Sequence, residues 1–177
     1  MPAMRKLGVI LGGLGLVFGA LAEERASAAS ASQGGADARK HLADFFLRTK
    51  GVTRVVSASD VFEGIRTGKS KYRVVDVRPP EEYEKGHVPG AINIPLDVLF
   101  RPASLEKLPA AGDAILLVCQ SGHMESMALG GLAALGYDPY VLRFGMIGWN
   151  AETKVKVAGA PGQAPEVVRG LGGPIEK

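Results

Sequence analysis

The chemistry that this sequence could perform centres on its only cysteine, Cys119, which opens the stretch CQSGHMES at residues 119–126. The apolar run AILLV precedes the cysteine directly, and a helix-like segment, MALGGLAALG, follows the stretch. In an open parallel sheet, ligands bind outside the carboxyl ends of the strands. A residue that comes directly after a buried strand therefore occupies the position of a site residue, and an ionised thiol there can act as a nucleophile.

The residues after the cysteine favour a reactive thiol over an inert one. Gly122 allows a tight turn, and Gln120, Ser121 and His123 are polar. Backbone N–H groups of such a loop, together with the positive end of the following helix, can point at the sulfur and stabilise an anion. The alternative is a small side chain buried at the end of a strand, because cysteine is among the most often buried residue types. The polar neighbours favour the nucleophile.

Strands alternate with helices along the chain, which predicts an α/β fold with a parallel sheet. Two apolar segments are typical of strands covered on both faces: residues 72–78, YRVVDVR, and residues 113–118, DAILLV. Shorter strands are expected at 54–56, 92–94 and 139–143, and helices at 37–49, 57–68, 79–86, 125–136 and 145–150. The first of these helices is expected to be amphipathic, with Leu42, Phe45 and Phe46 on its apolar side and Leu47 beside them.

The N-terminus is typical of a secretory signal peptide. Arg5 and Lys6 precede an uncharged apolar run over residues 7–22, and small-x-small sites occur at 20–22 and 26–28. We expect a signal peptide over residues 1–22, with cleavage as late as 28, and a periplasmic or secreted product without stable membrane insertion. The alternative is an uncleaved anchor, although the run falls short of the roughly 20 residues that span a bilayer and contains five glycines.

The remaining organisation is one domain between two less regular segments. Residues 23–36 are expected to form a flexible spacer, residues 37–150 the domain, and residues 151–177 a Gly/Pro-rich C-terminal tail. The formal charge is +3 at pH 7 and would be near +1 without the two basic residues of the leader, which is too weak to predict nucleic-acid binding. A single cysteine cannot form an internal disulfide, so an exported domain would be held together by its core.

Two stretches resemble the signatures of rhodanese domains. VVDVRPPEEYEKGHVPGAINIP resembles the first and LLVCQSGHMESMALGGLAALGYDPYVLRFGMIGW the second, so the resemblance runs from Val74 to Trp149. It implies a rhodanese-like α/β fold, with a five-stranded parallel sheet and helices on both faces. It also implies a sulfurtransferase without a cofactor, in which Cys119 accepts a sulfane sulfur as a persulfide and passes it to a thiophilic acceptor, either a small molecule or a protein thiol.

The predicted substrate-binding loop departs from the family at two positions. Its members would be Gln120, Ser121, Gly122, His123, Met124 and Glu125. Family domains usually carry Arg at the position of Met124 and Ser or Thr at that of Glu125. An Arg fork suits a doubly charged oxyanion such as thiosulfate, whereas a carboxylate facing the pocket would repel it. We therefore expect thiosulfate to be a poor donor, unless His123 or Arg143 supplies the positive charge, and polysulfide or a persulfide to be a better one.

Four further residues are candidates for a supporting role. The family places Asp76 and Arg78 near the site, where a structural role is favoured for Asp76. Arg78 could aid anion binding or form a surface ion pair with neighbouring acidic residues. His87, in GHVPGA, is expected to hold a turn by hydrogen bonding, and Arg143 is the remaining basic candidate.

Close packing is expected around the last helical turn. Gly145 should allow that turn to approach the cysteine loop, and Trp149 should cover the end of the sheet. A metal site is not predicted, because Cys119 and His123 supply only two ligands.

Two other functions remain open. A non-catalytic rhodanese-like binding or redox-sensing module is favoured by the missing loop Arg, while the retained cysteine argues against it. A phosphatase or arsenate reductase would need a longer cysteine loop with a terminal Arg to hold a tetrahedral dianion, and Glu125 opposes such an anion.

Overall fold

The structure is a computed structural model that describes residues 13–110, 112–150, 154–157 and 166–177. The chain divides into two compact units, residues 1–39 and residues 40–177. Helix α1, Gly13–Arg48, begins in the first unit and ends in the second.

The described part of the first unit is helical. Residues 23–36, for which the sequence predicts a flexible spacer, belong to α1. The composition accounts for the difference, since alanine, the residue with the highest helix propensity, recurs through this segment. The basic start of the predicted signal peptide, within residues 1–12, lies outside the described residues. In the part of the chain that the structure describes, no helix is long and apolar enough to cross a membrane.

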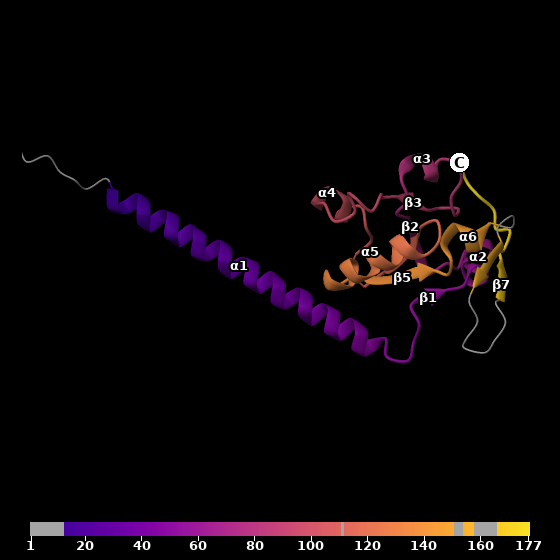
Figure 1. The fold of residues 1–177 in the computed structure, drawn as a ribbon, viewed down its shortest axis with the longest axis horizontal. Coiled ribbons are helices and arrows are strands. Elements are labelled where there is room, and N and C mark those ends of the chain that lie inside the picture. The colour runs from indigo at the N-terminus through magenta and orange to yellow at the C-terminus, as the bar shows by residue number, and fades with distance from the viewer. Residues whose placement is uncertain (1–12, 111, 151–153, 158–165) are drawn as a thin grey trace, which may run out of the picture. The chain divides into compact units, whose positions relative to one another are not determined.

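The second unit contains the five-stranded parallel sheet that the sequence predicts (Figure 1). Its strand order is β1-β5-β4-β2-β3, and every pairing is parallel. The two strongly apolar segments form the adjacent central strands β2 and β4, which explains why both are buried on two faces. The strands are β1 Val55–Val56, β2 Tyr72–Asp76, β3 Ile92–Asn93, β4 Ala114–Val118 and β5 Asp138–Leu142.

Helices cover both faces of this sheet and create two core clusters. One cluster contains α5, His123–Ala134, and α4, Pro102–Leu105, packed on one face. The other contains α2, Ala58–Arg66, and α6, Gly145–Trp149, together with Tyr83 at the end of α3, Pro80–Tyr83. Helix α2 begins as the sequence predicts, because the Ser57 hydroxyl accepts the backbone N–H of Asp60 at 3.1 Å and caps the helix.

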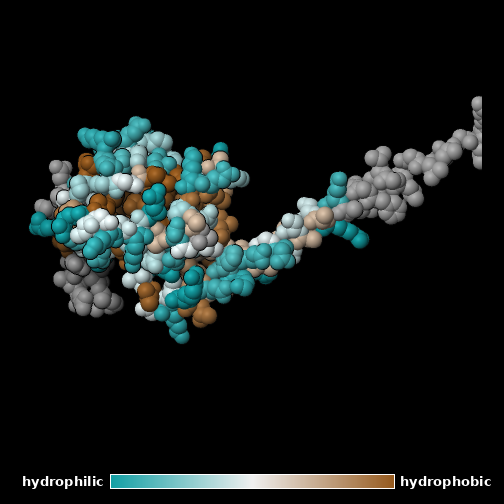
Figure 2. Space-filling view, turned by 180° about the vertical axis from the view of Figure 1, so that it is seen from behind, coloured by the Kyte–Doolittle hydropathy of each residue, from teal (hydrophilic) through white to brown (hydrophobic). Residues whose placement is uncertain are grey.

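The start of the second unit buries fewer apolar residues than expected. In α1, Phe45 is buried and Leu42 is half-buried, whereas Phe46 and Leu47 are exposed. The expected apolar side is therefore narrower than predicted: Phe46 does not share the burial of Phe45, because only one narrow side of this last helical stretch packs on the rest of the unit. On the face seen in Figure 2, hydrophilic side chains cover much of the domain and apolar side chains lie in patches between them.

The described part of the C-terminal segment packs on the domain. β6, Lys154–Val157, and β7, Glu166–Arg169, form an antiparallel pair. The chain then returns to α6, where the indole N–H of Trp149 donates to the carbonyl of Pro174 at 2.7 Å. It ends near the turn that follows α3, where the backbone of Glu176 pairs with that of His87 (Figure 1). Trp149 is therefore buried by the segment that the sequence describes as a tail.

Strand register brings the predicted site residues to one edge. Asp76 of β2 lies opposite Val118 of β4, and the N–H of Val77 donates to the Val118 carbonyl at 2.8 Å. Cys119 directly follows Val118, the last residue of β4. The segment that follows β2 and the cysteine loop therefore leave the sheet side by side.

Candidate active site

Cys119 lies at the end of the central strand β4 with 1% of its surface exposed. Its Sγ accepts a hydrogen bond from the backbone N–H of Gly122 at 3.1 Å. Gly122 has φ 103°, a left-handed conformation that favours glycine, and it is the N-cap of α5. The turn therefore places the sulfur beside a backbone donor at the positive end of a twelve-residue helix, as the sequence predicts.

The last helical turn holds the cysteine loop from its other side. The N–H of Met146 donates to the Cys119 carbonyl at 2.8 Å, and the N–H of Ile147 donates to the Gln120 carbonyl at 3.0 Å. Gly145 makes this approach possible, since a Cβ at that position would collide with the Cys119 carbonyl and its φ is 53°. The expected role of Gly145 is confirmed.

Glu125 faces the inside of the cysteine loop and is fully buried. Its Oε2 accepts the backbone N–H of Cys119 at 2.6 Å, and its Oε1 has no hydrogen-bond partner. Burial raises the pKa of Glu125 from 4.5 to about 8, assisted by the charge of Asp76 and opposed by hydrogen bonds from the Cys119 backbone and side chain. Near pH 7 the carboxyl is therefore mostly protonated, and it does not add a full negative charge to the loop.

Asp76 and Arg78 form a buried ion pair at the end of β2. The Arg78 Nη2 lies 2.7 Å from Asp76 Oδ2, its Nε contacts both carboxylate oxygens at 3.0 Å, and Nη2 also donates to the Gly86 carbonyl at 2.9 Å. With Arg78 only 4% exposed, this pair is not the surface ion pair considered for Arg78 from the sequence. The Arg78 guanidinium therefore donates to groups of the protein itself, and breaking a buried ion pair of this kind is strongly destabilising.

His87 lies in the turn where the sequence places it. Its Nδ1 is 3.1 Å from the Tyr83 carbonyl, and its ring stacks on that of Tyr83 with centroids 3.7 Å apart. Its backbone pairs with Glu176 of the C-terminal segment. These contacts are those of a residue that holds a turn.

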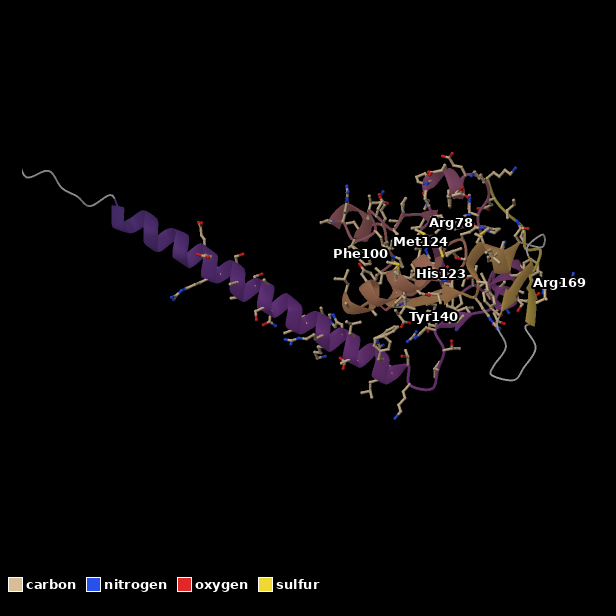
Figure 3. All side chains as sticks on the ribbon, in the orientation of Figure 1. Arg78, Phe100, His123, Met124, Tyr140 and Arg169 are labelled. Carbon is tan, nitrogen blue, oxygen red and sulfur yellow. The ribbon has the colours of Figure 1, made fainter. Side chains whose placement is uncertain are left out.

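The two expected sources of positive charge lie in different places. His123 is exposed at the first position of α5, with Nδ1 2.9 Å from the Ser121 hydroxyl. Arg143 is also exposed, but it lies over the Phe144 ring and lines a separate cavity of about 190 Å³ together with Arg169. Figure 3 shows Arg169 on the far side of the domain from Phe100, with Met124 and His123 between them in this view.

A groove beside the cysteine loop has no counterpart in the sequence analysis. Its volume is about 580 Å³, and Met124, in the first turn of α5, forms one wall. The other walls come from the turns after β2 and β3. The eight lining residues are Val77, Pro79, Pro80, Pro95, Leu96, Asp97, Val98 and Met124. The prolines that follow β2 and β3 are visible in the sequence and indicate turns there. Only the parallel register of the two strands, however, brings these turns together into one groove.

Within the described ranges, no group of three or more His, Cys, Asp or Glu side chains is gathered that could hold a metal ion. At the cysteine itself, the described residues supply the Cys119 sulfur, the Gly122 N–H and the buried Glu125 carboxyl.

Comparison with known proteins identifies the family. Residues 57–152, more than half of the chain, match the rhodanese-like domain. The putative sulfur carrier protein YrkF from Bacillus subtilis is 31% identical over 129 residues, which cover 68% of this chain and 68% of YrkF. The chain belongs to the rhodanese-like domain family, and its five-stranded parallel sheet is the fold expected from the resemblance.

Other relatives carry names that refer to sulfur transfer. The thiosulfate sulfurtransferase PspE from Escherichia coli is 41% identical over 64 residues, which cover 36% of this chain and 60% of PspE. A sulfurtransferase from Allochromatium vinosum is 31% identical over 94 residues, covering 52% of this chain and 79% of that protein. These likenesses support sulfur transfer as the general class of activity. The chain spans less than two thirds of the length of PspE.

A solved structure supports the fold alone. The BH2092 protein from Bacillus halodurans superposes with a TM-score of 0.50 at 24% identity, covering 59% of this chain and 76% of that one.

Replacing Glu125 by Gln is expected to reduce the pH dependence of stability. The folded state keeps a proton that the unfolded state releases above the ordinary pKa of 4.5, so raising the pH favours unfolding until the folded-state pKa of about 8 is passed. In the wild type this contribution lowers the free energy of unfolding by up to about 1.4 kcal/mol per pH unit between those values. Glu125→Gln keeps an acceptor for the Cys119 N–H and removes the titration. Urea denaturation at a series of pH values measures the difference.

The matched control is Glu106→Gln, which removes an exposed carboxyl at the end of α4. This control should show nearly the same change in the free energy of unfolding per pH unit as the wild type. If Glu125→Gln and the wild type instead lose stability in parallel as the pH rises from about 5 to about 8, Glu125 is ionised in the folded protein and the account of its burial is wrong.

Proposed function

We propose that this protein is a sulfurtransferase or persulfide carrier in which Cys119 accepts a sulfane sulfur and passes it to a thiophilic acceptor. The observation that carries the proposal is the position of the Cys119 sulfur, at the carboxyl end of a central strand and 3.1 Å from the Gly122 N–H at the start of α5. A backbone donor and a helix N-terminus stabilise negative charge on the thiolate and on the persulfide that replaces it.

The proposed reaction has two displacements. The Cys119 thiolate attacks the terminal sulfane sulfur of a donor, the S–S bond of the donor breaks, and the electron pair leaves with the remaining donor sulfur. In the second step an acceptor thiolate attacks the outer sulfur of the persulfide, and the electron pair returns to Cys119. The outer sulfur lies about 2.05 Å beyond Sγ, so it extends from a cysteine that is itself buried.

The donor is proposed to be polysulfide or a persulfide, with thiosulfate a poor substitute. Arg78 is committed to Asp76 and Gly86, and Arg143 lines a different cavity, so neither matches a guanidinium aimed at a dianion beside the cysteine. Met124 offers no charge at the position where related domains usually carry Arg. An organic persulfide, or a polysulfide protonated at one end, carries at most one charge and depends less on such a fork than thiosulfate, which is doubly charged.

Incubation with polysulfide is expected to load one sulfur on each molecule. The loaded species would be seen by intact-mass spectrometry in the wild type and would be absent in Cys119→Ser, since no other thiol exists in the chain. Absence of loading in the wild type would contradict sulfur transfer and support the other candidate, a non-catalytic rhodanese-like binding or redox-sensing module.

Met124→Arg is expected to raise the rate of thiosulfate:cyanide sulfur transfer by about tenfold or more, because it adds a charge-assisted hydrogen bond to the donor. The matched control is Met127→Arg, which places the same charge on the next turn of α5, where the side chain is 71% exposed. An equal rate in all three proteins would mean that the side chain at position 124 does not meet the donor.

We also propose export to the periplasm or beyond the cell, with removal of a leader at residue 22 or as late as residue 28. The basic start, the apolar run and the small-x-small sites support it. The mass of the protein recovered from the periplasmic or culture fraction of an expressing bacterium is expected to begin at residue 23 or 29. Full-length protein in the membrane fraction would instead support the uncleaved anchor.

A further inference from the structure

The walls of the apolar groove are tied to the strand that carries the cysteine. Val77 donates its N–H to the Val118 carbonyl at 2.8 Å, and the N–H of Leu96 donates to the Val77 carbonyl at 3.1 Å. Val118 directly precedes Cys119. On the opposite side, Met124 packs against the core cluster that contains Cys119. The groove therefore adjoins the cysteine loop, of which Met124 is a member.

Size and composition indicate an organic ligand. Of the eight described residues that line the groove, seven are apolar and one, Asp97, is charged and exposed. Its volume of about 580 Å³ lies within the range of roughly 300–1,000 Å³ that is typical of small-molecule sites. Polysulfide and thiosulfate are too polar and too small to gain from such walls, whereas a carbon chain would remove apolar surface from water.

The single charge of the lining selects among organic ligands. Asp97 is exposed and is the one charged residue among the eight that line the groove, so it is the charge that the polar end of a ligand bound there would meet. An ammonium group there would be attracted, and a carboxylate would be repelled. Arg78, in the turn after β2, is already paired with Asp76 and is not one of the groove's lining residues.

Resting on the proposed sulfur transfer, we propose that this groove binds the organic part of the acceptor, and that the acceptor is a small thiol with an apolar chain and a terminal ammonium group. Its thiolate attacks the outer sulfur of the Cys119 persulfide, the S–S bond to Sγ breaks, and the products are the free Cys119 thiolate and the persulfide of the acceptor. The proton of the acceptor thiol goes to solvent, and no oxidant or reductant is consumed.

The test uses the full chain loaded with polysulfide and measures loss of the extra sulfur by intact-mass spectrometry after a thiol is added. Straight-chain aminoalkanethiols of increasing length are compared with mercaptoalkanoic acids of the same length. Each methylene that enters the groove is expected to raise the second-order rate constant by up to about fourfold. Compounds of equal chain length are then compared, after each rate constant has been divided by the rate constant of the same thiol with a small-molecule persulfide. The corrected rate constant of the ammonium compound should be about two- to fivefold higher than that of the carboxylate.

Asp97→Asn is expected to abolish the charge preference while it keeps the dependence on chain length. The matched control is Asp113→Asn, an exposed aspartate in the turn before β4 that does not line the groove, and it should behave as the wild type. Because both substitutions are on the surface, neither should prevent folding. The thiols differ in intrinsic reactivity, so each rate constant with the loaded protein is divided by the rate constant of the same thiol with a small-molecule persulfide.

The outcomes separate this inference from the proposed function. If polysulfide does not load Cys119, sulfur transfer itself is wrong. If loading succeeds but the discharge rate does not change with chain length or terminal charge, the groove does not bind the acceptor. A peptide with a cysteine between leucines is the third arm. If only the peptide discharges the persulfide, the occupant is a protein segment and the assignment to a small thiol is wrong.

Discussion

The site depends on how the main chain of one residue is held. The N–H of Cys119 donates to the buried Glu125 carboxyl of α5, and the Cys119 carbonyl accepts the N–H of Met146 of α6. The two helices therefore both bind the main chain at the end of β4. With both backbone groups bound, the direction of the cysteine side chain is restricted. The Gly122 N–H is then positioned to bind the sulfur. The nucleophile, its anion-binding donor and the last helical turn are consequences of this one arrangement.

The two loop residues that depart from the family, Met124 and Glu125, have different surroundings and different effects. Glu125 is turned inward, where it binds the Cys119 backbone, and burial keeps it largely neutral near pH 7, so it does not oppose a persulfide as an exposed carboxylate would. Met124 is turned toward the groove, where a thioether extends an apolar wall. Where related domains usually carry a charged Arg, this loop therefore presents an apolar side chain, and the proposed preference for an organic ligand follows from that difference.

The surroundings of the loop are stabilised by contacts between distant parts of the chain. The Asp76–Arg78 pair fixes the turn after β2 and reaches Gly86, while the C-terminal segment binds the Trp149 indole and the backbone of His87. Removing one partner from a buried pair leaves an uncompensated charge, which is strongly destabilising. The support of the site therefore extends from β2 to the last residues of the chain.

The alternation of strands and helices and the position of Cys119 directly after an apolar strand could be predicted from local patterns, because each depends on neighbours in the sequence. The role of Gly145 was also predicted, although the contact that requires a glycine there is with the Cys119 carbonyl, which is distant in the sequence. The inward turn of Glu125, the burial of Arg78 and the helical state of residues 23–36 could not be predicted. The first two are decided by which elements pack against them, and the third by competition between helix propensity and chain flexibility. The groove is wholly tertiary: parallel pairing of β2 with β3 and β4 brings two proline-containing turns to Met124, and no local pattern records that pairing.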